Sequence, residues 1–409
     1  MPRRPKILTL TVCLTIAAGC TSSVVEGAGL PTVSGPDSST STSAGPTTTT
    51  TTSTTTTTTV APTTTTTLVP PDGLTAAERV LTHVATIGGG ISPKSVVASG
   101  DGLFFAQNMM YRHTVTVYDR NFELVATIDD RVTPAEFGHD GFDTELRGAP
   151  VEAAFTSDGS YAYVSNYKMY GGGLSTAAGD GCNAGSWPDS FVYRIDTLTL
   201  EIDQVIRVGP VPKFLAVTPD DRYLVVSNWC GFDVSIVDLD SGIETARVPV
   251  GRHPRGVAIS PGSETAYVAV MGSTRIGVID LASGEVGYLE GVGRSPRHLV
   301  ISPDGKTLYI SLNGEGRIAK IDLATGEVVA RVATGSAPRS MEISDDGSAL
   351  YVVNYNSNTM SKVRTGDMIE VSEHPTGPQP IGITYDAATR QVWVANYSGT
   401  IQVFADTAP

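Results

Sequence analysis

The sequence predicts an all-β fold, a seven-bladed β-propeller with four-stranded blades, from a repeat of fixed length, four β-rich runs in each repeat, and turn residues between the runs. Each regular repeat begins with a Gly-x-x-Pro tetrad, and successive tetrads start 42 residues apart. The tetrads begin at Gly209, Gly251, Gly293, Gly335 and Gly377. A constant interval of this length is typical of propeller blades.

Each repeat contains four short β-rich runs, seen best between Pro296 and Val332. Turn sequences such as Ser302–Gly305 place Pro and Asp ahead of a Gly, which accepts the positive φ that tight hairpins need. Four antiparallel strands in one repeat are the content of one propeller blade.

Two longer repeats precede the regular ones, starting at Pro93 and Pro150, so the expected number of blades is seven. The last repeat ends at Phe404 after three strands, and residues 84–88 match the missing fourth strand. Pairing the two ends in one closing blade removes an exposed sheet edge, which otherwise invites aggregation. We therefore expect the closing blade to be shared by an N-terminal strand and the C-terminal strands.

The N-terminus predicts export. Arg3, Arg4 and Lys6 precede an apolar run of about a dozen residues, too short to cross a bilayer. The run ends in Ala-Ala-Gly-Cys, which resembles the lipobox of bacterial lipoproteins, although an ordinary secretory signal that ends near a Cys is an alternative. We expect a signal peptide over 1–19, a lipid on Cys20, and an extracytoplasmic protein anchored to the cell membrane through that lipid.

The next segment, 20–72, consists mostly of Thr, Ser, Pro and Val. Such a composition buries too little apolar surface to offset the entropy of ordering, so it predicts a disordered stalk. The propeller is then expected over 73–409, as a monomer.

Charge and cysteine content fit an exported binding protein. The formal net charge of −14 disfavours non-specific binding to nucleic acid. Cys182 and Cys230 are the cysteines that remain beside Cys20 after loss of the signal peptide. In an oxidising compartment, this even pair predicts one disulfide between neighbouring loops of two blades.

The strand ends and turns resemble those of the YVTN family of β-propeller repeat proteins, over roughly residues 80 to 409. The similar segments are Tyr163–Asn166, Tyr351–Asn354 and Trp393–Asn396, together with the Ser-Pro-Asp-Gly turns and the Gly-x-x-Pro starts. The pattern departs at Val270 and Leu312, where other blades have Asn. The resemblance implies an extracytoplasmic binding propeller, and the family is too broad to imply one activity.

One face of the expected ring collects the irregular features: the long insertions near 129–148 and 167–190, and the residue after each blade-starting Pro. At five blades that residue is cationic, which predicts a positive funnel for an anionic ligand. The candidate binding residues are Lys94, Lys213, Arg255, Arg297 and Arg339, with the asparagines Asn108, Asn166, Asn228, Asn354 and Asn396. Alternatively, Arg after Pro is a structural feature of the repeat that bonds to neighbouring blades.

Weaker candidates lie on the same face. In the first insertion, the candidate metal ligands are His139, Asp140, Asp143 and Glu145. The alternative is that this insertion is a solvated acidic loop without a metal. The second insertion is rich in aromatic residues, which predict either stacking surfaces for a sugar or peptide or packing beneath the loop; they are Tyr167, Tyr170 and Trp187, with Trp229 in the next blade.

These patterns favour a cell-surface binding or scaffold propeller that recognises an anionic ligand or a cell-envelope protein. We expect no cofactor. The alternative is a lactonase-like hydrolase on the same face, with His253 and His298 as its candidate catalytic residues.

Overall fold

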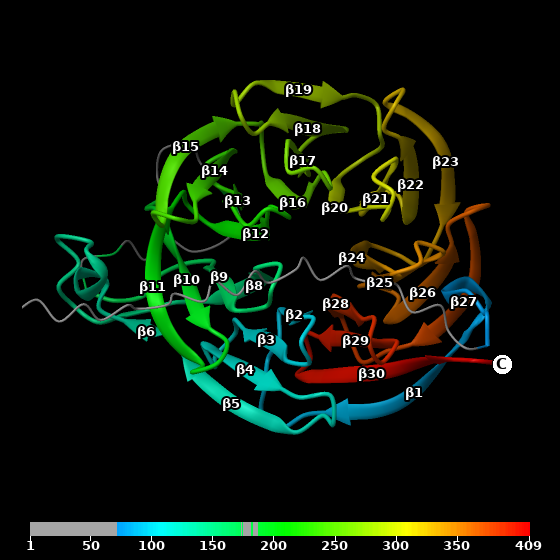
Figure 1. Ribbon diagram of the computed structural model, residues 1–409, viewed down its shortest axis with the longest axis horizontal. Helices are drawn as coiled ribbons and strands as arrows, with labels where there is room; N and C mark the ends of the chain where they lie inside the picture. The colour runs from blue at the N-terminus through cyan, green and yellow to red at the C-terminus, as the bar shows by residue number, and fades with distance from the viewer. Residues whose placement is uncertain (1–71, 173, 175–180, 183–186) are drawn as a thin grey trace, which may run out of the picture. The chain divides into compact units, whose positions relative to one another are not determined.

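The computed structural model describes residues 72–172, 174, 181–182 and 187–409. The expected signal peptide, Cys20 and the expected stalk up to residue 71 lie outside the described residues. In the part of the chain that the structure describes, seven four-stranded antiparallel sheets surround a central axis, as Figure 1 shows. The seven-bladed propeller predicted from the repeat is therefore confirmed.

The sheets follow one another along the chain. Blade one is β2 (Ser95–Ala98), β3 (Phe104–Asn108), β4 (Thr114–Tyr118) and β5 (Leu124–Asp129). Blade two is β8 (Pro150–Phe155), β9 (Tyr161–Asn166), β10 (Ser190–Asp196) and β11 (Glu201–Val208). Blade three is β12 (Pro212–Val217), β13 (Tyr223–Asn228), β14 (Asp233–Asp238) and β15 (Ile243–Pro249). Blade four is β16 (Pro254–Ile259), β17 (Thr265–Val270), β18 (Arg275–Asp280) and β19 (Val286–Leu289).

Three further blades complete the ring. Blade five is β20 (Pro296–Ile301), β21 (Thr307–Leu312), β22 (Arg317–Asp322) and β23 (Glu327–Ala333). Blade six is β24 (Pro338–Ile343), β25 (Ala349–Asn354), β26 (Thr359–Arg364) and β27 (Ile369–Pro375). Blade seven is β28 (Pro380–Asp386), β29 (Gln391–Asn396) and β30 (Thr400–Thr407) with β1 (Val80–Ile87).

The strands nearest the axis contact one another around the ring, so that β2, β8, β12, β16, β20, β24 and β28 enclose the channel. The second strands are buried on both faces because adjacent blades pack against each other: in β13, Leu224 to Asn228 are all buried. The outermost strands alternate instead, because one of their faces meets solvent, as in β15.

The two chain ends close the ring in blade seven, as predicted. β1 pairs antiparallel with β30, from Val80 opposite Thr407 to Ile87 opposite Ile401. Both strands are longer than the sequence predicted, which placed the N-terminal strand at 84–88 and the C-terminal end at Phe404. Each strand supplies the hydrogen-bond partners that let the other continue.

The remaining elements are small. β6 (Arg131–Val132) and β7 (Leu146–Arg147) form a two-stranded sheet, with the 3-10 turn η2 (Pro134–Phe137), in the insertion between blades one and two. A second 3-10 turn, η1 (Ala76–Glu78), precedes β1. Within the described ranges, no helix is long and apolar enough to cross a membrane.

Candidate functional site

The Gly-x-x-Pro tetrads build one mouth of the channel. The residue before each Pro has a left-handed backbone, with φ of 58° at Val211, 60° at His253, 54° at Ser295, 55° at Ala337 and 59° at Gln379. The carbonyl of this residue accepts a hydrogen bond from the backbone N–H of the residue that follows the second strand of the same blade. The donors, in the same order, are Trp229, Met271, Asn313, Tyr355 and Tyr397.

Each tetrad begins with Gly because the residue that ends the second strand leaves little room for a Cβ there. A Cβ at Gly335 would lie 2.7 Å from the Cβ of Asn354, and one at Gly209 would lie 2.4 Å from Nδ2 of Asn228. The Asn side chain thus packs directly on the tetrad backbone. In blades three, six and seven the Gly and the Asn are one packing unit, and in blades four and five Val270 and Leu312 take the place of the Asn.

The candidate asparagines turn into their own blades. All five are fully buried. Nδ2 of Asn228 donates to Asp233 and to Ser235, each at 2.8 Å, which ties the second strand of the blade to the third. Among the described residues that line the cavity at this mouth, none is one of these asparagines. The asparagines therefore stabilise the blades that carry the cavity and do not line it.

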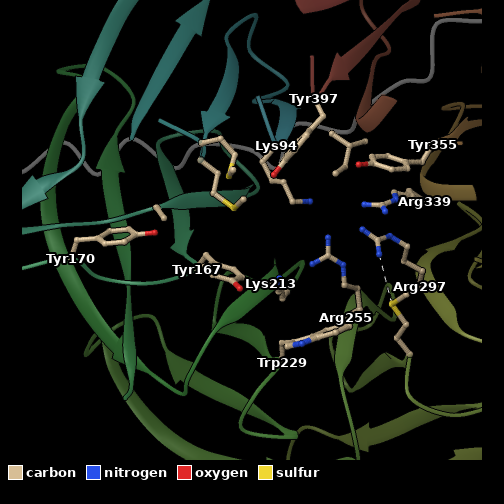
Figure 2. Close-up of a pocket in the computed structure, with 15 residues that line it drawn as sticks. Lys94, Tyr167, Tyr170, Lys213, Trp229, Arg255, Arg297, Arg339, Tyr355 and Tyr397 are labelled. Carbon is tan, nitrogen blue, oxygen red and sulfur yellow. Dashed lines mark hydrogen bonds between the residues drawn. The ribbon is translucent and has the colours of Figure 1, made fainter. Parts of the chain in front are cut away.

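The five candidate cations all line one cavity of about 580 Å³ at the channel mouth: Lys94, Lys213, Arg255, Arg297 and Arg339. Four of them, the exception being Arg339, are at most 8% exposed. Figure 2 shows the nitrogens of Lys94 and the three arginines pointing toward one another across this cavity. In these five blades the residue after the blade-starting Pro therefore lines the cavity.

Hydrogen bonds between blades fix the backbone of these residues. Oγ of Ser227 donates to the carbonyl of Arg255 at 2.6 Å, and Oγ of Ser311 donates to the carbonyl of Arg339 at 2.8 Å. Each serine lies on the second strand of the preceding blade. The charged side chains are thus mounted on a backbone that the neighbouring blade holds.

A second ring of residues forms the cavity wall, and sequence reasoning found only part of it. It consists of the residues that follow the second strand in six of the seven blades, all but blade five: Met109, Tyr167, Trp229, Met271, Tyr355 and Tyr397. The signal was present, because positions 229, 271, 313, 355 and 397 lie one repeat apart. Tyr167 and Trp229, predicted as members of an aromatic sector, belong to this ring.

Positive charge exceeds negative charge at the mouth. Burial holds the pKa of Lys94 well below its usual range, and the four other cations lower it further. Below them, burial raises the pKa of Glu152 to about 7, although Lys94 and Arg255 counteract the rise. Burial and the neighbouring Glu152 raise the pKa of Glu342 to about 8. Sequence reasoning missed these two glutamates, because they recur in no other blade.

The two candidate histidines are close to the cations but differ in setting. Burial, with Arg255 and Arg297, lowers the pKa of His298 to about 3, so this imidazole is neutral at physiological pH. His253 stacks on Trp229, with ring centroids 4.3 Å apart and planes 12° apart. His298 packs edge-on against Phe214 at 4.9 Å.

Cys182 and Cys230 form the predicted disulfide, with Cα atoms 5.1 Å apart. The bond joins the insertion of blade two to the loop of blade three that carries Trp229. It therefore fixes one sector of the cavity wall.

The candidate metal residues are not brought together. Nε2 of His139 lies 2.7 Å from the carbonyl of Val205, and Glu145 pairs with Arg131 at 3.9 Å. Across residues 72–172, 174, 181–182 and 187–409, no group of three or more His, Cys, Asp or Glu side chains is arranged to hold a metal ion. Asp140 and Asp143 lie in the same insertion, between η2 and β7.

Comparison with known proteins gives the fold and a family. The model of the YNCE-like beta-propeller family matches residues 182–406, which is more than half of the chain and includes four of the five cations. A chain of Kuenenia stuttgartiensis hydrazine synthase is similar with a TM-score of 0.60 and 20% identity, covering 79% of this chain and 98% of that one. At this identity the likeness concerns the fold alone. Because 1715 chains of solved structures match, the fold does not select one function.

No curated protein matches the chain.

Proposed function

Since this chain belongs to the YNCE-like beta-propeller family, we propose that it is a binding propeller that holds an anionic ligand in the cavity at its channel mouth. One observation carries the proposal: five cationic side chains from five different blades line the same cavity. Low-dielectric walls concentrate the field of such a cluster, and Arg and Lys are the side chains that suit carboxylate and phosphate groups.

The proposal also includes the location of the protein, outside the cytoplasm and anchored to the membrane. The lipobox-like motif at Cys20 and the Thr-rich segment after it would place the propeller outside the cytoplasm on a membrane tether. A YVTN-type role at the cell envelope, with either a free anion or an acidic patch of an envelope protein as ligand, fits this location. Metabolic labelling with a palmitate analogue, lost in Cys20→Ser, tests the anchor.

Hydrolysis of a lactone or ester on the same face is the alternative. One observation favours this alternative: His298 is a neutral imidazole, the form that can accept a proton, and it lies beside Arg255 and Arg297. A group with a pKa near 3 is a weak base at neutral pH, however, which favours binding over general-base catalysis. Turnover of a lactone panel that is lost in His298→Gln would establish the enzyme instead.

The test of anion binding uses the variant Arg255→Gln, Arg297→Gln, Arg339→Gln and isothermal titration with sulfate, phosphate and citrate. The wild-type protein is expected to bind at least one of these anions. The triple variant is expected to lose at least about tenfold in affinity, because charge-assisted hydrogen bonds contribute about 1.5–3 kcal/mol each.

A matched control removes the same number of charges from the opposite face. Arg222, Lys306 and Arg364 lie at the first and third turns of their blades, away from the mouth. Their triple Gln variant is expected to bind as the wild type does. Equal affinity of the cavity variant and the wild type would refute the proposal.

A further inference from the structure

The aromatic residues of the cavity wall hold the cations. Nζ of Lys213 lies 4.1 Å from the ring centre of Tyr167 and 5.3 Å from that of Trp229. The guanidinium carbon of Arg339 lies 3.4 Å from the ring centre of Tyr355. Contacts of this kind attract a cation to the face of the ring.

The same contacts leave less ring surface for a ligand. One face of Trp229 is covered by the parallel ring of His253. The guanidinium covers a face of Tyr355, as Figure 2 shows, where the ring of Tyr355 lies beside Arg339. The sulfur of Met271 plays a similar part for Arg297, whose Nη1 lies 3.7 Å from it. The wall therefore orients charged groups toward the centre.

The five cationic groups are gathered in one small cavity and are not spread along a groove. Four cations, Arg255, Arg297, Lys213 and Arg339, each depress the pKa of Lys94, so all of them lie within electrostatic reach of its ammonium. Their nitrogens share a cavity of about 580 Å³. Like charges gathered in a partly buried cavity repel one another, and several negative charges in one small ligand would relieve that repulsion.

We infer, on the premise of the anion-binding function proposed above, that the ligand is a compact polyanion, such as an oligophosphate or a small polycarboxylate. It is held by charge at the centre of the mouth, and Tyr167, Trp229 and Tyr355 act as positioning residues for Lys213 and Arg339. Affinity then follows the number of negative charges on the ligand and not its aromatic surface.

The first test compares ligands by isothermal titration. Tripolyphosphate is expected to bind at least about tenfold more tightly than phosphate, because it engages additional charge-assisted contacts. Phenyl phosphate is expected to bind within about threefold of phosphate, because the covered rings give its phenyl group little to stack on. Phenyl phosphate that binds more than threefold more tightly, or tripolyphosphate that gains less than tenfold, overturns the inference.

The proposed function and the polyanion inference can fail separately. If none of the three anions binds, the proposed function fails. If phosphate binds but the affinity follows the aryl group and not the charge, the proposed function holds and the polyanion inference fails.

The second test is a double-mutant cycle between Tyr355 and Arg339. Tyr355→Leu is expected to weaken tripolyphosphate binding about as much as Arg339→Gln does, and to have little further effect in the Arg339→Gln background. Tyr355→Phe keeps the aromatic ring and is expected to bind tripolyphosphate within about twofold of the wild type. This recovery would show that the ring face, and not only the volume of the side chain, is what Arg339 needs. Additive effects of the two substitutions would mean that Tyr355 contacts the ligand itself, and would overturn the positioning role.

Discussion

Nζ of Lys362 lies 2.6 Å from Oδ1 of Asp406, and neither side chain is accessible to solvent. Lys362 is on β26 of blade six and Asp406 is on β30 of blade seven. The ammonium also donates to the carbonyl of Arg79 at 2.9 Å, just before β1, and the hydroxyl of Tyr351 donates to Oδ2 of Asp406 at 2.6 Å. One buried network thus joins blade six to both chain ends in the closing blade.

This network predicts a large loss of stability when one partner is removed. Lys362→Met leaves the carboxylate of Asp406 buried without its counter-charge, and is expected to lower the free energy of unfolding by about 3–5 kcal/mol. The measurement is equilibrium unfolding in guanidinium chloride.

The exposed pair Arg364–Asp367 on the same blade is the control for that loss. Its atoms are 2.7 Å apart, but the side chains are 44% and 45% exposed. Arg364→Ala is expected to leave the unfolding midpoint close to that of the wild type, because solvent screens an exposed pair. Equal losses in Lys362→Met and Arg364→Ala would show that the buried pair does not secure the closure.

The packing of Gly335 on Asn354 gives a second prediction. Gly335→Ala is expected to destabilise the protein by about 1–3 kcal/mol, because its Cβ would overlap the Asn354 side chain, which is tied to Ser361 at 2.8 Å. Gly366→Ala is the control, since a Cβ there meets nothing within 4 Å. Thermal unfolding of the two variants checks the difference, and similar melting temperatures would count against the packing unit.

The two carboxyl groups below the mouth give a prediction about pH. A bound anion favours the neutral form of Glu152, whose pKa is about 7, and of Glu342, whose pKa is about 8, and it favours the charged form of Lys94. All three effects take up protons. Affinity for sulfate, which keeps its charge in this range, is therefore expected to rise about two- to fivefold per unit as the pH falls from 9 to 6.

Titration calorimetry in buffers of different ionisation enthalpy measures this proton uptake directly. Glu152→Gln is expected to reduce the uptake and flatten the pH profile, because the amide does not titrate. Sulfate affinity that is constant or falls on acidification would contradict the expectation.

The disulfide gives the last prediction. The bond closes a loop with a sequence separation of 48. The double variant Cys182→Ser, Cys230→Ser is expected to lose about 2–4 kcal/mol of stability. Addition of dithiothreitol should lower the unfolding midpoint of the wild type to that of the variant and leave the variant unchanged. An equal response of both proteins to the reductant would show that the bond contributes nothing.

The repeat made much of the fold predictable. A constant interval shows which residues occupy equivalent places in different blades, so the sequence alone placed Arg255, Arg297 and Arg339 at one mouth. It also predicted the closing blade and the pairing of Cys182 with Cys230. These conclusions need only strand order and the alternation of faces, which the spacing determines.

Side chains whose partners do not repeat could not be predicted from the spacing. Glu152 and Glu342 recur in no other blade. Lys362 is matched one repeat earlier by Lys320, but Lys320 donates to the carbonyl of Thr365, whereas the partner of Lys362 is a carboxylate 44 residues away. What each of them does depends on which atoms other blades bring near, and that is settled by packing around the ring.

The candidate asparagines show the same limit. The repeat placed Asn228 and Asn354 correctly at the ends of their strands, yet their side chains pack on the tetrad glycines instead of facing the cavity. The sequence by itself determined the ring, its closure and the face on which the cations lie. Only the tertiary structure decided which side chains meet in the channel, because burial and the charges of other blades set both their orientation and their pKa values.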